Sequence, residues 1–338
     1  MDVQDLVYAE LFTSDKVSTA DYFVSALGFS RVADAVETDR SSVLLRQGDV
    51  QLVITSGRGT WRFLDSHGEG IADLAFSCDD PTAVGERAVA AGAARLESAR
   101  GTTVVSGFGG VAHTLLRPAV RPGEALADGR RWTPCPHTPS AAPAIRLLDH
   151  VAVCLAGGTL DWYADYYRDA FGFSRYSSEY VAVGGQAMDS VVVRSASGRV
   201  TFTLVAPDPA KEPGQLDTFL ERNGGPGVQH LAFLVGDIIA AVGEARDLGV
   251  EFLATPDTYY DVLAERFDGD TDRIAELRKA QVLADRDEWG HLLQLFTRSP
   301  YERNTLFFEL IQREGSRGFG SANIRALYEA VERDRLTS

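Results

Sequence analysis

The sequence "DYFVSALGFSR" at residues 21–31 returns as "DYYRDAFGFSR" at residues 165–175, with seven of eleven positions identical. A second pair follows in the same order. The stretches "GIADLAFSCDDPTAVGERAVAAGA" (70–93) and "GVQHLAFLVGDIIAAVGEARDLGV" (227–250) share Gly, Leu-Ala-Phe, Asp and a closing Gly in register. Two matches in one order indicate that a single module has been duplicated within this chain of 338 residues.

Each copy has the same expected layout. An apolar strand (6–12, then 147–155) leads into an amphipathic helix that ends at a Gly-Phe pair. Strand-like runs follow, including a hairpin in the second copy with Ser197 and Gly198 at its turn. Then come the Leu-Ala-Phe strand, another helix and a final apolar run. We therefore predict an α+β fold in which the order βαβββ occurs twice in each half.

A proline-rich segment separates the two halves. Residues 118–143 hold six of the thirteen prolines, a composition typical of an extended linker with little structure of its own. We predict an N-terminal domain over residues 1–118, a linker over 119–145 and a C-terminal domain over 146–338.

The composition restricts the class of protein. Hydrophobic residues make up 45% and charged residues 24%, which is typical of a soluble globular protein. The formal net charge of −15 repels nucleic acid and anionic membrane surfaces. The first residues show no signal-peptide pattern, no stretch approaches the roughly 20 apolar residues that cross a bilayer, and three scattered cysteines form no zinc or disulfide pattern. We expect a cytoplasmic enzyme or small-molecule binder.

One acidic residue stands out in the apolar run "NTLFFELIQREG" (304–315). Strand alternation places Phe307, Glu309 and Ile311 on one face. A carboxylate held against these side chains is costly unless something positive pairs with it, such as an arginine, a water-filled site or a metal ion.

Paired βαβββ units whose helices end at Gly-Phe resemble the vicinal oxygen chelate superfamily, whose modules curl into open half-barrels that hold a metal. The narrower resemblance is to the 4-hydroxyphenylpyruvate dioxygenase family. It extends over nearly the whole chain, and its diagnostic residues all lie in the second half. The resemblance implies two tandem vicinal oxygen chelate (glyoxalase-like) domains: an N-terminal one without metal, and a catalytic C-terminal one with a C-terminal lid helix.

The resemblance also implies a ligand set. His150 in "LLDHVAVCL", His230 in "GVQHLAFLV" and Glu309 are 80 and 79 residues apart, so only a folded barrel can bring them together. A lone histidine on an apolar strand is more often a core residue than a ligand, but these three all fall at the metal-binding strands of the module. Two histidines and one carboxylate form the facial triad that leaves three positions on Fe(II) open for substrate and O2.

Other positions are not expected to bind the metal. The first half has Tyr8, Asp73 and roughly Thr114 where the second has its ligands, so one site per chain is expected. The remaining histidines are read as structural or surface residues: His67, His113, His137 and His291.

In this family the substrate is a small aromatic 2-oxo acid that binds iron through its carboxylate and keto oxygens, without a separate 2-oxoglutarate. The residues that match the family's pocket are Ser190, Gln215, Gln229, Gln294, Phe296, Phe307, Phe319 and Asn323. The plain alternative for a glutamine is a solvated strand residue, and for a phenylalanine it is core packing. The amphipathic tail at 323–331 looks like the family's lid, the alternative being an ordinary C-terminal helix packed on the barrel.

Product choice within the family depends on few residues. Dioxygenases of the family typically have Pro-x-Asn where this chain has Thr203-Leu204-Val205, and Phe where it has Ile324. These departures resemble the 4-hydroxymandelate synthase branch, which places Thr203, Val205, Asn323 and Ile324 among the residues that direct catalysis. The expected reaction converts 4-hydroxyphenylpyruvate and O2 to 4-hydroxymandelate and CO2, by oxidative decarboxylation and benzylic hydroxylation. Its product would serve 4-hydroxyphenylglycine and nonribosomal peptide antibiotic formation.

Three alternatives remain open. The chain could be a dioxygenase that gives homogentisate in tyrosine catabolism, or a non-catalytic small-molecule binder. An extradiol ring-cleaving enzyme would share the triad but not the "GFGSAN" tail (318–323). A homodimer is a family expectation only. The residues do not separate 4-hydroxyphenylpyruvate from phenylpyruvate or fix the product's stereochemistry, and Asp189, where relatives often have Asn, has no explanation.

Overall fold

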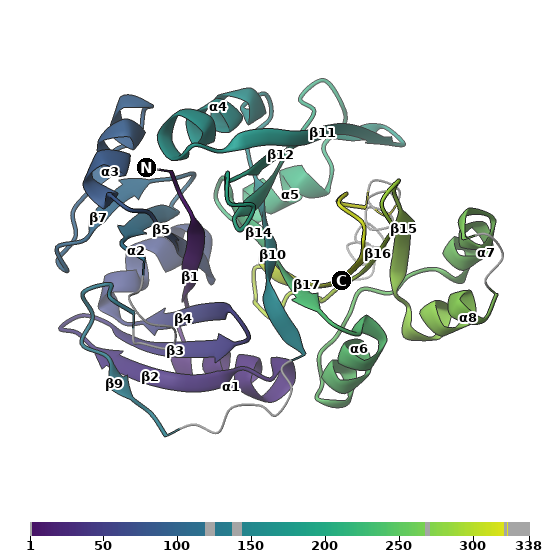
Figure 1. Cartoon of the computed structure of the whole chain (residues 1–338), viewed down its shortest axis with the longest axis horizontal. Coiled ribbons are helices and arrows are strands. Elements are labelled where there is room, and N and C mark those ends of the chain that lie inside the picture. Colours follow the sequence, from purple (N-terminus) through teal and green to yellow (C-terminus); the bar gives the residue numbers. More distant parts are fainter. Residues whose placement is uncertain (1, 119–125, 137–143, 268–270, 321–322, 324–338) are drawn as a thin grey trace.

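The computed structural model describes residues 2–118, 126–136, 144–267, 271–320 and 323. Two curved sheets lie side by side, one from each half of the chain (Figure 1). The predicted α+β fold of tandem half-barrels is confirmed. Among the described residues, no helix is long and apolar enough to cross a membrane.

The N-terminal sheet has the strand order β6-β7-β8-β5-β1-β4-β3-β2-β9. Its strands are β1 (Asp5–Phe12), β2 (Ser30–Val36), β3 (Ser41–Gln47), β4 (Val50–Ser56), β5 (Gly70–Ser77), β6 (Arg95–Leu96), β7 (Thr103–Ser106), β8 (Ala112–Leu116) and β9 (Thr133–Pro134). The helices of this half are α1 (Lys16–Leu27), the 3-10 turn η1 (Arg58–Thr60), α2 (Trp61–His67) and α3 (Pro81–Ala90).

The C-terminal sheet has the order β11-β12-β13-β10-β14-β17-β16-β15. Its strands are β10 (Ile145–Cys154), β11 (Ser174–Val183), β12 (Gln186–Arg194), β13 (Thr201–Pro207), β14 (Gly227–Val235), β15 (Leu283–Arg286), β16 (His291–Phe296) and β17 (Phe307–Glu314). Its helices are α4 (Leu160–Phe171), α5 (Gln215–Arg222), α6 (Ile238–Asp247), α7 (Asp257–Arg266) and α8 (Thr271–Ala280).

The two strand orders match element by element, apart from the added β9. In each half the modules read βαβββ twice: β1-α1-β2-β3-β4, then β5-α3-β6-β7-β8, and the same again from β10 onward with α7 and α8 inserted before β15. Within each sheet the two modules meet along one antiparallel pair, β1 with β5 and β10 with β14. The duplication seen in the sequence is therefore a duplication of topology.

The Gly-Phe pairs end the first helix of each half, as predicted. Gly28 and Gly172 close α1 and α4 in the left-handed conformation, with φ of 75° and 76°, which suits glycine. The phenylalanine that follows each glycine, Phe29 or Phe173, is buried and anchors the chain as it turns into the next strand.

The middle of the segment between the halves is more structured than its proline content predicts. Thr133–Pro134 forms β9 on the edge of the N-terminal sheet, against β2. The Arg130 guanidinium is buried and pairs with Glu10 and Asp128. A buried cation with two carboxylate partners fixes this stretch to the sheet, so residues 126–136 belong structurally to the N-terminal half. The exact domain boundaries stay a prediction.

The two halves share one continuous apolar core. The ring of Phe23 in α1 meets that of Phe308 in β17 at 5.1 Å, edge to face. The C-terminal half likewise reaches into the N-terminal half: the Tyr167 hydroxyl of α4 lies 2.9 Å from Nε2 of His113 in β8. Because Phe308 faces this core, its neighbours Phe307, Glu309 and Ile311 face the other side of β17, as the alternation predicts.

Candidate metal centre

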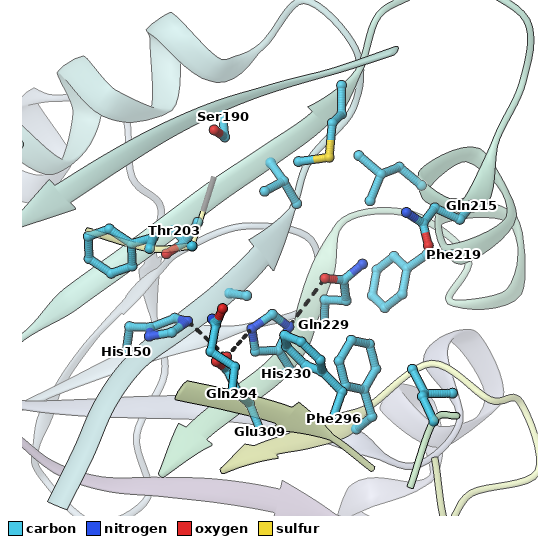
Figure 2. Close-up of a pocket in the computed structure, with 18 of the residues that line it drawn as sticks. His150, Ser190, Thr203, Gln215, Phe219, Gln229, His230, Gln294, Phe296 and Glu309 are labelled. Carbon is cyan, nitrogen blue, oxygen red and sulfur yellow. Dashed lines mark hydrogen bonds and ion pairs between the residues drawn. The ribbon is translucent and has the colours of Figure 1, made fainter. Parts of the chain in front are cut away.

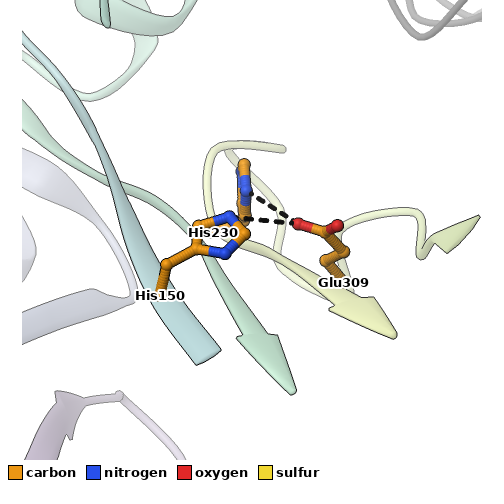
Figure 3. A group of neighbouring side chains, drawn as sticks. All are labelled: His150, His230 and Glu309. Atoms are coloured by element: carbon orange, nitrogen blue, oxygen red, sulfur yellow. Dashed lines mark ion pairs between the residues drawn. The ribbon is translucent and has the colours of Figure 1, made fainter. Parts of the chain in front are cut away.

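Three neighbouring strands bring His150, His230 and Glu309 together. The strands β10, β14 and β17 are adjacent, and their register aligns His150 with Ala232 and Ala232 with Glu309. His230 precedes Ala232 by two residues and therefore lies on the same face. One ligand-type atom from each of the three buried side chains lies within 4.8 Å of the others (Figure 3).

The Glu309 carboxylate is the point where the two imidazoles converge. Its Oε2 lies 3.3 Å from Nε2 of His150 and 3.2 Å from Nε2 of His230. The exposed fraction of the Glu309 side chain is only 1%. Glu309, whose burial in an apolar strand would be unfavourable without partners, thus has two histidine partners. The three side chains predicted as ligands lie together.

A second contact orients each imidazole. Nδ1 of His150 donates to the Asp149 carboxylate at 2.9 Å, and Nδ1 of His230 lies 3.3 Å from the amide oxygen of Gln229. With Nδ1 engaged by an acceptor, each ring presents its Nε2 to Glu309. This is the tautomer that a metal-binding histidine adopts when an acceptor holds its other nitrogen.

Backbone bulges explain why neighbours in sequence can touch here. The register of β10 against β14 slips between Leu148 and His150, and again opposite Gln229. Each slip adds one residue, Asp149 or Gln229, that would otherwise point to the opposite face. The bulges turn these two side chains toward the adjacent histidines.

The charges of the triad perturb one another. Burial would lower the pKa of His150, but the Glu309 carboxylate and the Asp149 hydrogen bond outweigh it and raise the pKa to about 9. Burial lowers the pKa of His230 despite its contact with Glu309. Although burial alone would raise the pKa of Glu309, the two histidines hold it at about 2. The charges thus favour an ionised Glu309 carboxylate beside a protonated His150 and a neutral His230.

The N-terminal sheet has three positions equivalent to those of the triad, occupied by different residues. Tyr8 pairs with Ala75 just as His150 pairs with Ala232, which makes Asp73 the counterpart of His230 and Thr114 that of Glu309. Both Tyr8 and Thr114 hydroxyls donate to Oδ2 of Asp73, at 3.2 and 2.6 Å. In this half the three side chains are therefore hydrogen-bonded to one another.

The triad lies in a pocket on its side of the C-terminal sheet (Figure 2). Every predicted substrate or product-directing residue within the described range lines it: Ser190, Thr203, Val205, Gln215, Gln229, Gln294, Phe296, Phe307, Phe319 and Asn323. Ile324 and the expected lid helix lie outside the described residues. Asp189 is exposed on β12 and does not line this pocket, so its role stays unexplained.

A chain of amides extends from the triad to the tail. The Gln294 amide donates to Oε1 of Glu309 at 2.8 Å and accepts from the Asn323 amide at 2.9 Å. The Tyr259 hydroxyl of α7 donates to Asn323 Oδ1 at 2.8 Å. The second carboxylate oxygen of Glu309 is therefore occupied, which leaves Oε2 for the centre.

Aromatic rings surround the histidines. Phe307 stacks on His230 with ring centroids 4.9 Å apart, and Phe319 meets His150 edge-on at 5.3 Å. On β13, the Thr203 hydroxyl is buried without a hydrogen-bond partner among the described residues. The Thr305 hydroxyl, which also lines the pocket, likewise has no partner among the described residues. The pocket therefore combines apolar walls with hydroxyl groups free for a ligand.

Two neighbours of the triad were missed by sequence reasoning. Asp149 touches His150 directly, and Arg313 holds Asp149 in turn. The signal was present, since each is a charged residue in an apolar strand, next to or four residues from a predicted ligand. Phe219 of α5 also lines the pocket and carried no such signal.

Comparisons with known proteins agree with this geometry. Residues 147–295 match the Glyoxalase/Bleomycin resistance protein/Dioxygenase superfamily. A 4-hydroxyphenylpyruvate dioxygenase of Neurospora crassa is 33% identical over 80% of this chain and 71% of its own length, and one of Aspergillus fumigatus is 30% identical over 96% and 91%. The chain belongs to the 4-hydroxyphenylpyruvate dioxygenase family.

A solved structure within this family is more similar still. A triple mutant of 4-hydroxymandelate synthase from Streptomyces coelicolor is 49% identical, with a TM-score of 0.91 over 99% of this chain and 100% of that one. Membership of the 4-hydroxyphenylpyruvate dioxygenase family makes the protein a dioxygenase-type enzyme. The pocket described above is its candidate active site.

Proposed function

We propose that this protein is an Fe(II)-dependent 4-hydroxymandelate synthase, which converts 4-hydroxyphenylpyruvate and O2 to 4-hydroxymandelate and CO2. The observation that carries the proposal is one pocket with the His150, His230 and Glu309 triad at one end and Thr203 and Val205 in its wall. The 49% identity to a solved mandelate synthase supports the same choice. A place in 4-hydroxyphenylglycine and antibiotic formation belongs to the proposal too.

The donor set fits ferrous iron. Two imidazole Nε2 atoms and one carboxylate oxygen converge, both rings are fixed through Nδ1, and the three side chains line the pocket that would admit a substrate. When bound, iron supplies the activation of O2 and the oxidative decarboxylation of the 2-oxo acid. The chain's own residues have to bind, orient and shield the substrate.

The pocket offers room for one elongated aromatic acid. It extends from the triad to Ser190 on β12 and to Gln215 and Phe219 at α5 (Figure 2). Phe307 and Phe319 flank the histidines, so an aromatic substrate would meet apolar ring walls there. The amide chain through Gln294 keeps Glu309 from rotating as the substrate binds.

Product choice rests on how the ring is held. Thr203 and Val205 are two residues apart on β13 and therefore share the face that lines the pocket. Valine at 205 offers no hydrogen bond to the ring's hydroxyl, which leaves the ring free to tilt and the benzylic carbon nearer the reacting centre. A difference of about 1.4 kcal/mol between competing barriers changes a product ratio tenfold, so one wall residue is enough.

The test is product analysis after anaerobic loading with Fe(II). With 4-hydroxyphenylpyruvate and air, we expect 4-hydroxymandelate and one CO2 per O2 consumed. Val205→Asn should raise the share of homogentisate roughly tenfold because it adds an amide to the wall. Val205→Ala, which removes volume without adding an amide, is the matched control and should not.

Other results would point elsewhere. Homogentisate from the unmutated protein would mean a tyrosine-catabolic dioxygenase. Iron binding without oxygen uptake would reject this substrate, and absence of metal binding would reject the enzyme in favour of a small-molecule binder.

A further inference from the structure

Asp149 connects the candidate metal ligand His150 to a distant part of the chain. It is the extra residue of the β10 bulge between Leu148 and His150, and 9% of its side chain is exposed. Its Oδ1 accepts from Nδ1 of His150 at 2.9 Å and also from Nη2 of Arg313 at 2.8 Å. Its Oδ2 accepts from Nε of Arg313 at 2.7 Å. The carboxylate is thus shared between the ligand and a two-pronged arginine, a geometry that fixes direction as well as charge.

Arg313 carries the connection onward to the tail. Its Nη1 donates to the Gly318 carbonyl at 2.6 Å, and its guanidinium lies 5.2 Å from the ring centroid of Phe319. The ring of Phe319 in turn meets His150 at 5.3 Å. His150, Asp149, Arg313 and the stretch 318–319 therefore form a closed loop of contacts.

The far side of this tail segment is also fixed. Oδ2 of Asp287, in the turn between β15 and β16, accepts at 2.8 Å from the backbone N–H of Arg317, from that of Gly318 and from the Ser316 hydroxyl. Residues 316–318 are therefore held by Arg313 on one side and by Asp287 on the other. Because this segment is fixed, a small movement of Arg313 is transmitted to Phe319.

The N-terminal half serves as an internal comparison. Its β1 has the same bulge, and there the extra residue is Val7, where β10 has Asp149. Counting on from Thr114, the counterpart of Glu309, the position of Arg313 is Pro118. The copy that lacks the ligand set keeps the bulge yet lacks both members of the pair. The bulge alone therefore does not need Asp149 and Arg313.

We infer that Asp149 and Arg313 are positioning residues that orient His150 for the metal and couple metal binding to the order of residues 315–320. The inference rests on the proposed metal site. When a metal holds His150, Asp149 and Arg313 are held with it, and Gly318 and Phe319 become more ordered. By linkage, loosening the tail lowers metal affinity.

The first experiment measures Co(II) affinity of the metal-free protein by competition with a chelator. Asp149→Ala and Arg313→Gln should each weaken Co(II) binding by roughly ten- to a hundredfold, the range for partners of metal-binding histidines. The double variant should be no weaker than the worse single one, because both remove the same connection. Arg313→Lys, which keeps the charge but not the two-pronged geometry, should fall in between.

The matched control is Arg100→Gln. Arg100 also makes a two-pronged pair, with Glu37 at 2.9 and 2.7 Å, but in the N-terminal half. Its loss should leave Co(II) affinity unchanged. Thermal melting of each metal-free variant checks that the fold is intact.

The second readout is hydrogen exchange of the backbone amides in 315–320. Co(II) should slow exchange there in the unmutated protein and in Arg100→Gln, but not in Arg313→Gln. Near-normal affinity in folded Asp149→Ala and Arg313→Gln, or tail protection by Co(II) that persists in Arg313→Gln, would overturn the inference. If the unmutated protein fails to bind Co(II), the proposed function itself fails, which is a separate outcome.

Discussion

At the residue scale, the main feature is a carboxylate in an apolar strand. Glu309 is buried among phenylalanines on β17, and an ionised group there costs several kcal/mol without partners. It has them in His150 and His230 at its Oε2 and Gln294 at its Oε1. Because these contacts leave one side of the group facing the pocket, we expect Glu309 to contribute to metal binding rather than to folding.

This expectation predicts the effect of Glu309→Gln. The amide keeps the shape and accepts from Gln294, but it supplies no negative charge, so Co(II) affinity should drop by more than about a hundredfold. Glu314→Gln, on the same strand but away from the pocket, should change Co(II) affinity by no more than about twofold. Chelator competition measures both. Equal affinities of the two variants would remove Glu309 from the ligand set.

At the element scale, the equivalent hairpins of the two halves have different tasks. The turn between β3 and β4 has Gly48 at φ 53°, and the turn between β12 and β13 has Gly198 at φ 72°. A Cβ at Gly48 would collide with the carbonyl oxygen of Arg146 and would lie 2.7 Å from that of Ile145, whereas no atom lies within 4 Å at Gly198. The first turn therefore packs against the backbone that begins β10, which carries His150.

The two glycines allow a matched test of this packing. Gly198→Ala should cost about 1 kcal/mol of unfolding free energy, from the left-handed backbone alone. Gly48→Ala should cost roughly 2–4 kcal/mol because the backbone of the other half must move as well. Urea unfolding of both variants measures the difference. Equal losses would mean that the turn yields without disturbing β10.

At the scale of the whole molecule, a buried histidine links the halves. His113 donates from Nδ1 to the Leu74 carbonyl and accepts at Nε2 from the Tyr167 hydroxyl of the C-terminal half. Burial lowers the pKa of His113 to about 4, against an ordinary value of 6.5. Its contribution to stability is therefore complete above pH 6.5 and is lost as the pH falls toward 4.

A variant that has no titrating group at position 113 should reveal this pH dependence of the unfolding free energy. Relative to the unmutated protein, His113→Gln should gain about 1.4 kcal/mol of unfolding free energy for each unit by which the pH falls from 6.5 to 4. Its absolute stability will be lower at neutral pH because the bridge to Tyr167 is weakened. Denaturant unfolding at several pH values measures this, and a pH-independent difference would contradict the burial argument.

Asp73 supplies the control with opposite sign. Burial and the nearby Glu10 raise its pKa to about 7 from 3.8, despite the hydrogen bonds from Thr114 and the charge of Arg130. Its stabilising effect is present at low pH and is lost as the pH rises toward 7. Asp73→Asn should therefore gain stability relative to the unmutated protein as the pH rises from 4 to 7. In the unmutated chain the pH dependences from His113 and Asp73 have opposite signs and partly cancel, so each is visible only when the other group is removed or when the variants are compared.

Much of the fold followed from the repeat. Two copies of one motif predicted two copies of βαβββ pairs, and the glycines that end α1 and α4 lie where the Gly-Phe pairs placed them. The segment between the halves was less predictable. Its prolines indicate an extended chain, but Arg130 pairs with Glu10, a residue 120 positions away, and local composition carries no information on such a contact.

The sequence by itself determined the module, its duplication and the residue types that can hold a metal, because periodicity and turn chemistry are local properties. Only the tertiary structure decided that His150, His230 and Glu309 share one row, since strand register depends on which strands become neighbours. It also decided that Asp149 and Gln229 each contact the histidine next to them, because a bulge overrides the alternation that the sequence pattern assumes. The pairing of Asp149 with Arg313 joins residues 164 positions apart, and only the folded sheet brings them into contact.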